Sequence, residues 1–222
     1  MNILITGSFG FIGSNLSLSI KNKINCKLFA LDISEPENHL YEEVYSWNNL
    51  DSLQNIDFDV IIHLAGKAHD TRNISDSNSY FEINTELTQK IYDYFLKSSS
   101  KKFIFFSSVK AAADNIFDII LKEDVIPKPK TPYGISKLLA EKYILKKLKP
   151  EKNIYILRPC MIHGSGNKGN FNLLFNIIKN RVPWPLGLFD NKRSFCSIDN
   201  LCFVINELIF QKPVPSGIYN LS

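Results

Sequence analysis

The chain has 222 residues and a net charge of +4, with 45% hydrophobic and 22% charged residues. This length suffices for one large domain with a small second lobe, and the composition is ordinary for a globular protein, which excludes general disorder. Much of the positive excess lies in the lysine-rich stretch 142–152, which we interpret as a solvated helix face and not as a nucleic-acid site.

Short apolar runs alternate with longer segments of helical period along the whole chain, a pattern typical of parallel strands joined by crossover helices. Most of the runs are rich in Ile, Leu, Val and Phe, as a sheet covered on both faces requires. Strands are predicted at Asn2–Thr6, Lys27–Leu31, Asp59–Leu64, Lys102–Ser107 and Asn153–Leu157. Helices are predicted at Phe11–Ile20, Ser79–Leu96, Pro132–Leu148, Phe171–Lys179 and Ile198–Phe210. We therefore predict an α/β fold with a Rossmann-type, doubly wound parallel sheet.

The character of the chain changes after Pro159, where glycines and prolines break it into loops and short elements. We divide the chain into a larger domain at residues 1–163 and a small C-terminal lobe at residues 164–222 that is interleaved with the last sheet elements. The lobe is expected to face the substrate. The final residues, 217–222, are predicted to form a strand that ends without a closing helix.

The cysteines and one strand histidine are interpreted as structural. Cys26, Cys160, Cys196 and Cys202 show no paired close spacing, so we expect reduced thiols and neither a disulfide framework nor a metal site. We interpret His63, inside an apolar strand, as a hydrogen-bonded core residue and not as a ligand. The chain begins directly with a strand pattern, and no apolar run approaches the about 20 residues of a membrane span. We expect a cytoplasmic protein without membrane partners.

Three glycines, Gly7, Gly10 and Gly13, form a Gly-x-x-Gly-x-x-Gly turn between the first strand and its helix. Such glycines let the backbone approach a pyrophosphate, and the helix N-terminus favours its negative charge. Asp32 ends the second strand, where a carboxylate binds the adenosine ribose hydroxyls and repels a 2′-phosphate, which favours NAD over NADP. A glycine turn without a ligand, and an Asp32 that only caps a turn, are the alternatives.

Tyr133 and Lys137 are four residues apart on a predicted helix, so both lie on one face. A lysine ammonium near a tyrosine hydroxyl stabilises the phenolate and brings its pKa from about 10 toward neutrality, as a general base requires. Ser107 and Ser108 follow the fourth strand, at the edge where open parallel sheets present groups to ligands. Taken singly, each signal also fits an ordinary helix or turn.

Taken together, the motifs resemble the extended short-chain dehydrogenase/reductase family, and more narrowly its nucleotide-sugar epimerases and reductases. The resemblance runs along the whole chain. In order, its pieces are Ile5-Thr6-Gly7 with Gly10 and Gly13, Asp32, His63-Leu64-Ala65-Gly66, Asn84, Phe106-Ser107-Ser108, Thr131-Pro132-Tyr133-Gly134-Ile135-Ser136-Lys137 and Leu157-Arg158-Pro159.

This resemblance implies a set of catalytic and NAD-binding residues. Ser108, Tyr133 and Lys137 would be catalytic, with Tyr133 as the base and Lys137 holding the nicotinamide ribose and lowering the tyrosine pKa. Asn84 would anchor the neighbouring helix and strand. The implied NAD contacts are Gly7, Gly10, Phe11, Ile12, Gly13, Asp32, Leu64, Ala65, Gly66, Asn84, Ser107, Tyr133, Lys137, Pro159 and Ile162.

On the substrate side, the resemblance implies that Ser108, Asn170 and Arg193 contact the sugar nucleotide. Arg193 suits a phosphate because a guanidinium is a bidentate donor, although an exposed surface arginine is the alternative. Relatives usually form homodimers and continue beyond the point where this chain stops. The resemblance therefore implies a homodimer, and a substrate lobe that is only partly present.

The function implied by the resemblance is NAD-dependent 4-epimerisation of a UDP-sugar through a 4-keto intermediate. An NAD(P)-dependent 4-keto-sugar-nucleotide reductase would use the same residues. A non-catalytic, NAD-sensing Rossmann module is the alternative from another class. Val109 and Lys110 stand where sugar 4,6-dehydratases carry Asp-Glu, which argues against dehydration.

Overall fold

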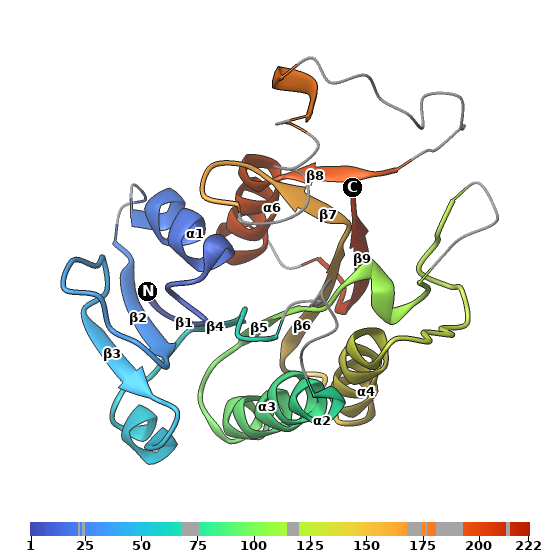
Figure 1. The fold of residues 1–222 in the computed structure, drawn as a ribbon. Coiled ribbons are helices and arrows are strands. Elements are labelled where there is room, and N and C mark those ends of the chain that lie inside the picture. The colour runs from blue at the N-terminus through green and yellow to red at the C-terminus, as the bar shows by residue number, and fades with distance from the viewer. Residues whose placement is uncertain are drawn as a thin grey trace, which may run out of the picture.

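The computed structural model describes residues 1–21, 23, 25–67, 76–114, 120–167, 175, 177–180, 193–211 and 214–222. Its centre is a sheet of seven parallel strands with helices on both faces (Figure 1). In chain order the strands are β1 (Asn2–Thr6), β2 (Lys27–Asp32), β3 (Glu43–Ser46), β4 (Val60–His63), β5 (Lys102–Phe106), β6 (Asn153–Pro159) and β9 (Gly217–Leu221). Their order across the sheet is β3-β2-β1-β4-β5-β6-β9. The strand order reverses between β1 and β4, as in a doubly wound Rossmann sheet, so the predicted fold class is confirmed.

Two apolar cores lie on the two faces of the sheet. Alternate residues of a strand point to opposite faces, so Ile3 and Ile5 belong to one core whereas Leu4 belongs to the other. The first face is covered by α1 (Phe11–Lys21) and α6 (Ile198–Phe210) (Figure 1). The second face is covered by α3 (Leu87–Lys97) and α4 (Pro132–Lys146), and α2 (Ser77–Phe81) packs beside α4. None of the helices in the described part of the chain is long and apolar enough to cross a membrane.

The predicted helix Ser79–Leu96 is present, but it contains a wider turn. Helical structure runs from α2 through a π-helical turn at Glu82–Glu86 into α3. A π turn adds one residue within a single turn, which is too local for a periodicity taken over the whole segment to reveal. The predicted helix Phe171–Lys179 falls largely outside the described residues. Within it, the structure describes residues 175 and 177–179, and these are helical.

Three short strands were not predicted from the sequence. β3 has only two apolar residues, Val44 and Tyr45, and lies at the edge of the main sheet. β7 (Met161–His163) and β8 (Phe195–Ser197) form a separate parallel pair, in which Ile162 lies opposite Cys196. Strands of three or four residues are too short to show a clear alternation.

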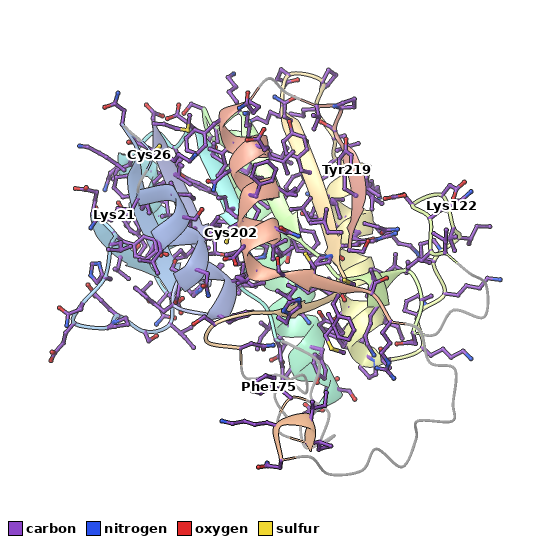
Figure 2. All side chains as sticks on the ribbon, turned by 90° about the horizontal axis from the view of Figure 1, so that it is seen from above. Lys21, Cys26, Lys122, Phe175, Cys202 and Tyr219 are labelled. Atoms are coloured by element: carbon purple, nitrogen blue, oxygen red, sulfur yellow. The ribbon has the colours of Figure 1, made fainter. Side chains whose placement is uncertain are left out.

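Within residues 164–222, two elements complete the main fold. α6 packs beside α1, where Asn206 Nδ2 donates a hydrogen bond to Ser19 Oγ (2.6 Å). β9 adds the last strand beside β6. The cysteines of this region, Cys196 and Cys202, are buried free thiols, and Figure 2 shows Cys202 on α6.

Candidate functional site

The turn between β1 and α1 requires glycine at two positions. Gly7 has a φ of +67°, and a Cβ there would lie 2.7 Å from the backbone nitrogen of Ala65. A Cβ on Gly13 would lie 2.6 Å from Gly7 O, because the first turn of α1 packs directly on the loop. The remaining residues of the predicted contact set are accessible here: Gly10 is exposed, and Phe11 and Ile12 are half-buried. The backbone thus presents the N-terminus of α1 to an anion without an intervening side chain.

Asp32 lies at the end of β2, beside this glycine turn. Its Oδ2 accepts a hydrogen bond from the Phe9 backbone N–H (3.0 Å), and its Oδ1 accepts one from the Ile33 N–H (2.7 Å). Asp32 therefore caps this turn, which is the alternative role that the sequence left open. The carboxylate remains partly exposed, and each oxygen keeps a further lone pair for a ligand hydroxyl.

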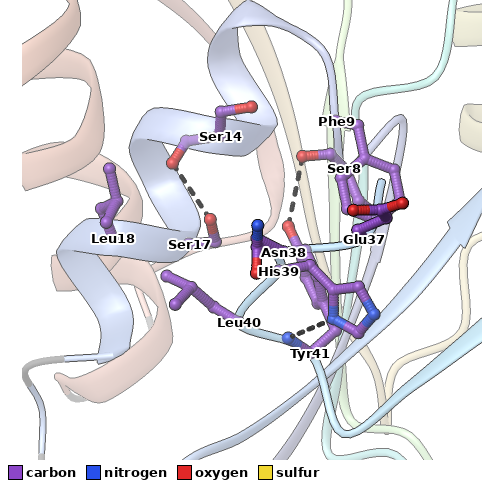
Figure 3. Close-up of a pocket in the computed structure, with 10 residues that line it drawn as sticks. All are labelled: Ser8, Phe9, Ser14, Ser17, Leu18, Glu37, Asn38, His39, Leu40 and Tyr41. Atoms are coloured by element: carbon purple, nitrogen blue, oxygen red, sulfur yellow. Dashed lines mark hydrogen bonds between the residues drawn. The ribbon is translucent and has the colours of Figure 1, made fainter. Parts of the chain in front are cut away.

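A pocket of about 430 Å³ lies between α1 and residues 37–41, next to the same turn (Figure 3). Tyr41 buttresses the turn, since its hydroxyl donates to Ser8 O (3.2 Å) and its ring meets Phe9 edge-on at 5.5 Å. No pattern in the sequence predicts this contact, because Tyr41 follows a loop without periodicity. The lining residues are Ser8, Phe9, Ser14, Ser17, Leu18, Glu37, Asn38, His39, Leu40 and Tyr41.

His63 connects β1, β4 and α3 through both ring nitrogens. Its Nδ1 lies 2.7 Å from Thr6 Oγ1, and its Nε2 lies 2.9 Å from Thr88 Oγ1. Thr88 donates its own hydrogen to Asn84 O (2.7 Å), and Thr6 Oγ1 accepts the Ala65 N–H (3.1 Å). These bonds assign the hydrogen to Nε2, and burial lowers the pKa of His63 well below its ordinary value. His63 is a neutral, fully bonded core residue, as predicted.

Asn84 joins the segment after β4 to α4. Its Oδ1 accepts the Lys67 N–H (2.8 Å), while its Nδ2 donates to Lys67 O (3.1 Å) and to Ser136 Oγ (3.1 Å). The segment Leu64–Lys67 is therefore fixed against the helix that carries Tyr133 and Lys137. Within this segment, a Cβ on Gly66 would lie 3.0 Å from Lys137 Nζ.

Ser108 and Tyr133 form the centre of the candidate site. Ser108 follows β5, and its Oγ accepts the Lys110 N–H (3.2 Å). Burial raises the pKa of Tyr133 above its ordinary value; a hydrogen bond with the Ser108 side chain opposes the rise, and neighbouring Tyr80 adds to it. The Tyr80 ring packs against the Tyr133 ring with centroids 6.1 Å apart. The structure therefore raises the Tyr133 pKa, whereas the Tyr-x-x-x-Lys spacing alone led us to expect a lower one.

Lys137 is buried one turn further along α4. Its Nζ donates to Phe106 O (2.8 Å) and lies 5.1 Å from the centre of the Phe105 ring. Burial lowers the pKa of Lys137 to about 8, and the charge of Glu141 opposes this shift. The ammonium therefore remains mostly protonated at neutral pH and places a positive charge at the end of β5.

Ser107, a predicted cofactor contact, points instead into the protein. Its hydroxyl donates to Glu141 Oε1, and both residues are buried. Arg158 completes this cluster with bonds from Nε to Glu141 Oε1 (2.8 Å) and from Nη2 to Oε2 (2.5 Å). This cluster was not predicted, although an arginine at the end of an apolar strand, Arg158 after Ile154–Leu157, indicates a buried partner.

Asp114 fixes the start of α4 close to the site. Its carboxylate accepts hydrogen bonds from the Lys130 N–H (2.5 Å) and from Thr131 Oγ1 (2.8 Å). Thr131 in turn caps α4, because its Oγ1 accepts the Gly134 N–H (3.2 Å). These bonds fix the helix turn that carries Tyr133, and no local motif in the sequence pointed to Asp114.

The other predicted contacts are less closely gathered. Pro159 is buried at the end of β6, and Ile162 is half-buried on β7. Arg193 is exposed two residues before β8. Asn170 lies outside the described residues. Of the predicted sugar-nucleotide contacts, the structure thus places Ser108 at the centre of the site and Arg193 in an exposed position before β8.

Residues 3–222 match the model of the NAD dependent epimerase/dehydratase family. The chain is 32% identical to the UDP-glucose 4-epimerase of Vibrio cholerae over 235 residues, which cover 100% of this chain and 70% of that protein. It is 25% identical to the UDP-N-acetylglucosamine 4-epimerase of Bacillus cereus, with a TM-score of 0.78 and coverage of 100% and 77%. The UDP-glucuronic acid 4-epimerase of Bacillus cereus, in complex with UDP-glucuronic acid and NAD, shares the fold with a TM-score of 0.82, 23% identity and the same coverage.

Proposed function

The chain belongs to the NAD-dependent epimerase/dehydratase family, and we propose that it catalyses the 4-epimerisation of a UDP-sugar with NAD as cofactor, through a 4-keto intermediate. The observation that carries this proposal is the hydrogen bond between Ser108 and Tyr133, one helical turn from the buried ammonium of Lys137. A module that only binds NAD has no use for this set of proton-transfer groups. The similarity to 4-epimerases of Vibrio cholerae and Bacillus cereus supports the same reaction.

The residues around the glycine turn suit NAD. The turn packs so closely on the protein's own backbone that it leaves no room for a side chain at Gly7 or Gly13, while Gly10 is exposed. The N-terminus of α1 behind this turn would face the pyrophosphate. Asp32 would accept the adenosine ribose hydroxyls, and the segment 64–66 would pass beside the nicotinamide half. When bound, NAD supplies the acceptor and later the donor of the hydride at the sugar carbon.

Tyr133, Ser108 and Lys137 would move and stabilise the proton. In its ionised form, which the Ser108 hydrogen bond favours, Tyr133 would take the proton of the C4 hydroxyl as the C4 hydride leaves, which gives the ketone. The Ser108 hydrogen bond stabilises the phenolate, since it lowers the Tyr133 pKa. Lys137, protonated below a pH of about 8, supplies positive charge at the same edge of the sheet. After the ketone has rotated in the site and presents its other face, Tyr133 would return the proton as the hydride returns to that opposite face of C4.

The wider organisation follows the same proposal. Residues 1–163 would hold NAD, and residues 164–222 would contribute substrate contacts through Asn170 and Arg193. The outer faces of α3 and α4 would pair in a homodimer. Leu139 (41% exposed) and Leu145 (38% exposed) on α4 support this surface, because exposed leucines on a helix lose contact with water when helices pair.

Cofactor retention separates this proposal from its two alternatives. An epimerase regenerates its NAD in each cycle, so mass spectrometry of the purified chain should find NAD that stays bound and unchanged while a UDP-sugar is turned over. A 4-keto-sugar-nucleotide reductase would instead consume added NADH or NADPH in proportion to product. An NAD-sensing module would bind NAD and convert no sugar nucleotide. Either of these two results would contradict the proposed 4-epimerisation.

A further inference from the structure

A buried ion pair lies directly behind the proposed catalytic residues. Glu141 and Arg158 are each 1% exposed in their side chains, and the Arg158 Nη2 lies 2.5 Å from Glu141 Oε2. Removing two charges from water is costly, and an apolar pair of similar size is often as stable. A buried pair of this kind therefore has little value for stability alone, and its contacts suggest another role.

The ion pair joins the three segments that frame the site. Glu141 stands four residues after Lys137, on the same face of α4. The two side chains bind successive residues at the end of β5: Lys137 Nζ donates to Phe106 O (2.8 Å), and Glu141 accepts the Ser107 hydroxyl. Arg158, from the end of β6, holds the carboxylate in this position. Ser107 directly precedes Ser108, so the cluster fixes the strand end that carries the catalytic hydroxyl.

We propose that Glu141, held in place by Arg158, is a positioning residue of the active site that fixes the end of β5 and keeps Lys137 in its charged form. The catalytic part of this inference rests on the proposed function, because it assumes that Ser108 and Lys137 serve the reaction. The electrostatic part concerns the chain alone and can be measured without substrate.

The groups around Lys137 show why Glu141 matters to its charge. Burial by the sheet and α4 lowers the Lys137 pKa, and Glu141 is the carboxylate that opposes this shift. His63, on β4, is neutral and gives no compensating negative charge. Tyr133, on α4, is neutral in the resting chain because its pKa is raised, so it gives no compensating charge there. Arg158, on β6, carries a positive charge that Glu141 neutralises. Among the groups in the described part of the chain, loss of the carboxylate would leave the ammonium facing neutral or positive neighbours.

The Lys137 titration can be followed directly in the whole chain. The protein would be labelled with ¹³C-lysine, the Lys137 signal assigned through Lys137→Met, and its chemical shift followed from neutral to alkaline pH. We expect a midpoint near about 8 in the original chain. In Glu141→Gln the midpoint should fall by about one pH unit or more, the effect of losing a nearby opposite charge. Glu141→Asp keeps the charge and should titrate close to the original chain.

Two further variants cover misfolding and indirect effects. Glu141→Gln leaves Arg158 buried without a partner, so the double variant E141M/R158M removes both charges and serves if the single variant does not fold. Its midpoint should lie between those of the original chain and Glu141→Gln. Asp93→Asn breaks a partly exposed ion pair between Asp93 on α3 and Lys147, which directly follows α4. This variant should leave the Lys137 midpoint unchanged.

An unchanged Lys137 midpoint in folded Glu141→Gln or in the double variant would overturn the inference. A lowered midpoint supports its electrostatic part, and a parallel shift of the alkaline limb of turnover to lower pH supports its catalytic part. A merely structural role would change stability without moving either midpoint. If the original chain lacks epimerase activity but Lys137 still follows Glu141, the proposed function fails while the electrostatic inference stands.

Discussion

Tyr133 is the side chain on which the proposed chemistry depends most. Tyr133→Phe removes one hydroxyl and almost no volume, so the variant should stay folded and bind NAD, with turnover reduced about 100- to 10,000-fold. Stopped-flow or steady-state measurement of sugar-nucleotide conversion gives this ratio. α4 offers a matched control in a second Tyr-x-x-x-Lys pair, Tyr143 and Lys147, whose tyrosine donates to Asp93 at the surface. If Tyr133→Phe and Tyr143→Phe are equally active, Tyr133 is not the acid–base group.

His63 predicts a pH dependence of stability. Burial holds its pKa in the folded chain well below the ordinary 6.5, so at mildly acidic pH the unfolded chain binds a proton that the folded chain does not. The stabilisation is present above about pH 6.5 and is lost as the pH falls below it, by up to about 1.4 kcal/mol per pH unit. Urea unfolding across this range measures the slope.

The variant His63→Gln tests whether His63 causes this dependence of the free energy of unfolding on pH. His63→Gln should have a smaller free energy of unfolding at neutral pH, because the bonds to Thr6 and Thr88 are disturbed, and it should lose less stability on acidification. Equal slopes in the original chain and in His63→Gln would contradict the assignment to His63.

The side chains that sequence analysis found differ from those it missed in how far apart their partners lie along the chain. Tyr133 and Lys137 are predictable because helix geometry places residues four apart on one face. Glu141 and Arg158 meet across 17 positions, and Thr6 meets His63 across 57, so only the assembled sheet brings them together. The Tyr133 pKa was misjudged for the same reason, since the spacing shows the lysine but not the burial.

The elements themselves were predictable where they are long and regular. The helix Ile198–Phe210 has the predicted bounds, and the strands β1, β2, β4, β5 and β6 are within two residues of those predicted. The π-helical turn at Glu82–Glu86 was not predictable, because it reflects how Asn84 bonds to Lys67 and Ser136 and not a change in the apolar pattern. The unpredicted strands β3, β7 and β8 depend on partners distant in the sequence.

Lys152 is buried beside the C-terminal end of α3, where its ammonium binds backbone carbonyl oxygens. Its Nζ donates to three carbonyl oxygens in the last turn of α3 and just after it, those of Phe95 (2.8 Å), Ser98 (2.8 Å) and Ser100 (2.9 Å). Lys152→Met keeps most of the volume but removes the ammonium donor from the carbonyl oxygens of Ser98 and Ser100, whereas Phe95 O still accepts from Ser98. The free energy of unfolding should therefore fall by about 1–3 kcal/mol. Urea titration gives the value, with exposed Lys142→Met of α4 as the control. A loss no larger than that of the control would show that water replaces the ammonium.

The topology explains why the site lies where it does. The strand order reverses between β1 and β4, and in open parallel sheets the ligand lies at the carboxyl ends of the strands on either side of such a reversal. The glycine turn after β1, Asp32 after β2, Gly66 after β4 and Ser108 after β5 all follow carboxyl ends of adjacent strands. α4 then brings Tyr133 and Lys137 to the same edge. Separate sequence motifs become one site because parallel strands end together.

Inversion at C4 tests the account most directly. The purified chain would be incubated in turn with UDP-glucose, UDP-N-acetylglucosamine and UDP-glucuronic acid, and the sugar protons followed by ¹H NMR. We predict that at least one of the three converts to its 4-epimer without net formation of NADH, and that Tyr133→Phe abolishes the conversion. A folded chain with bound NAD that inverts none of them, or that only accumulates NADH with a ketone product, would contradict the proposed reaction.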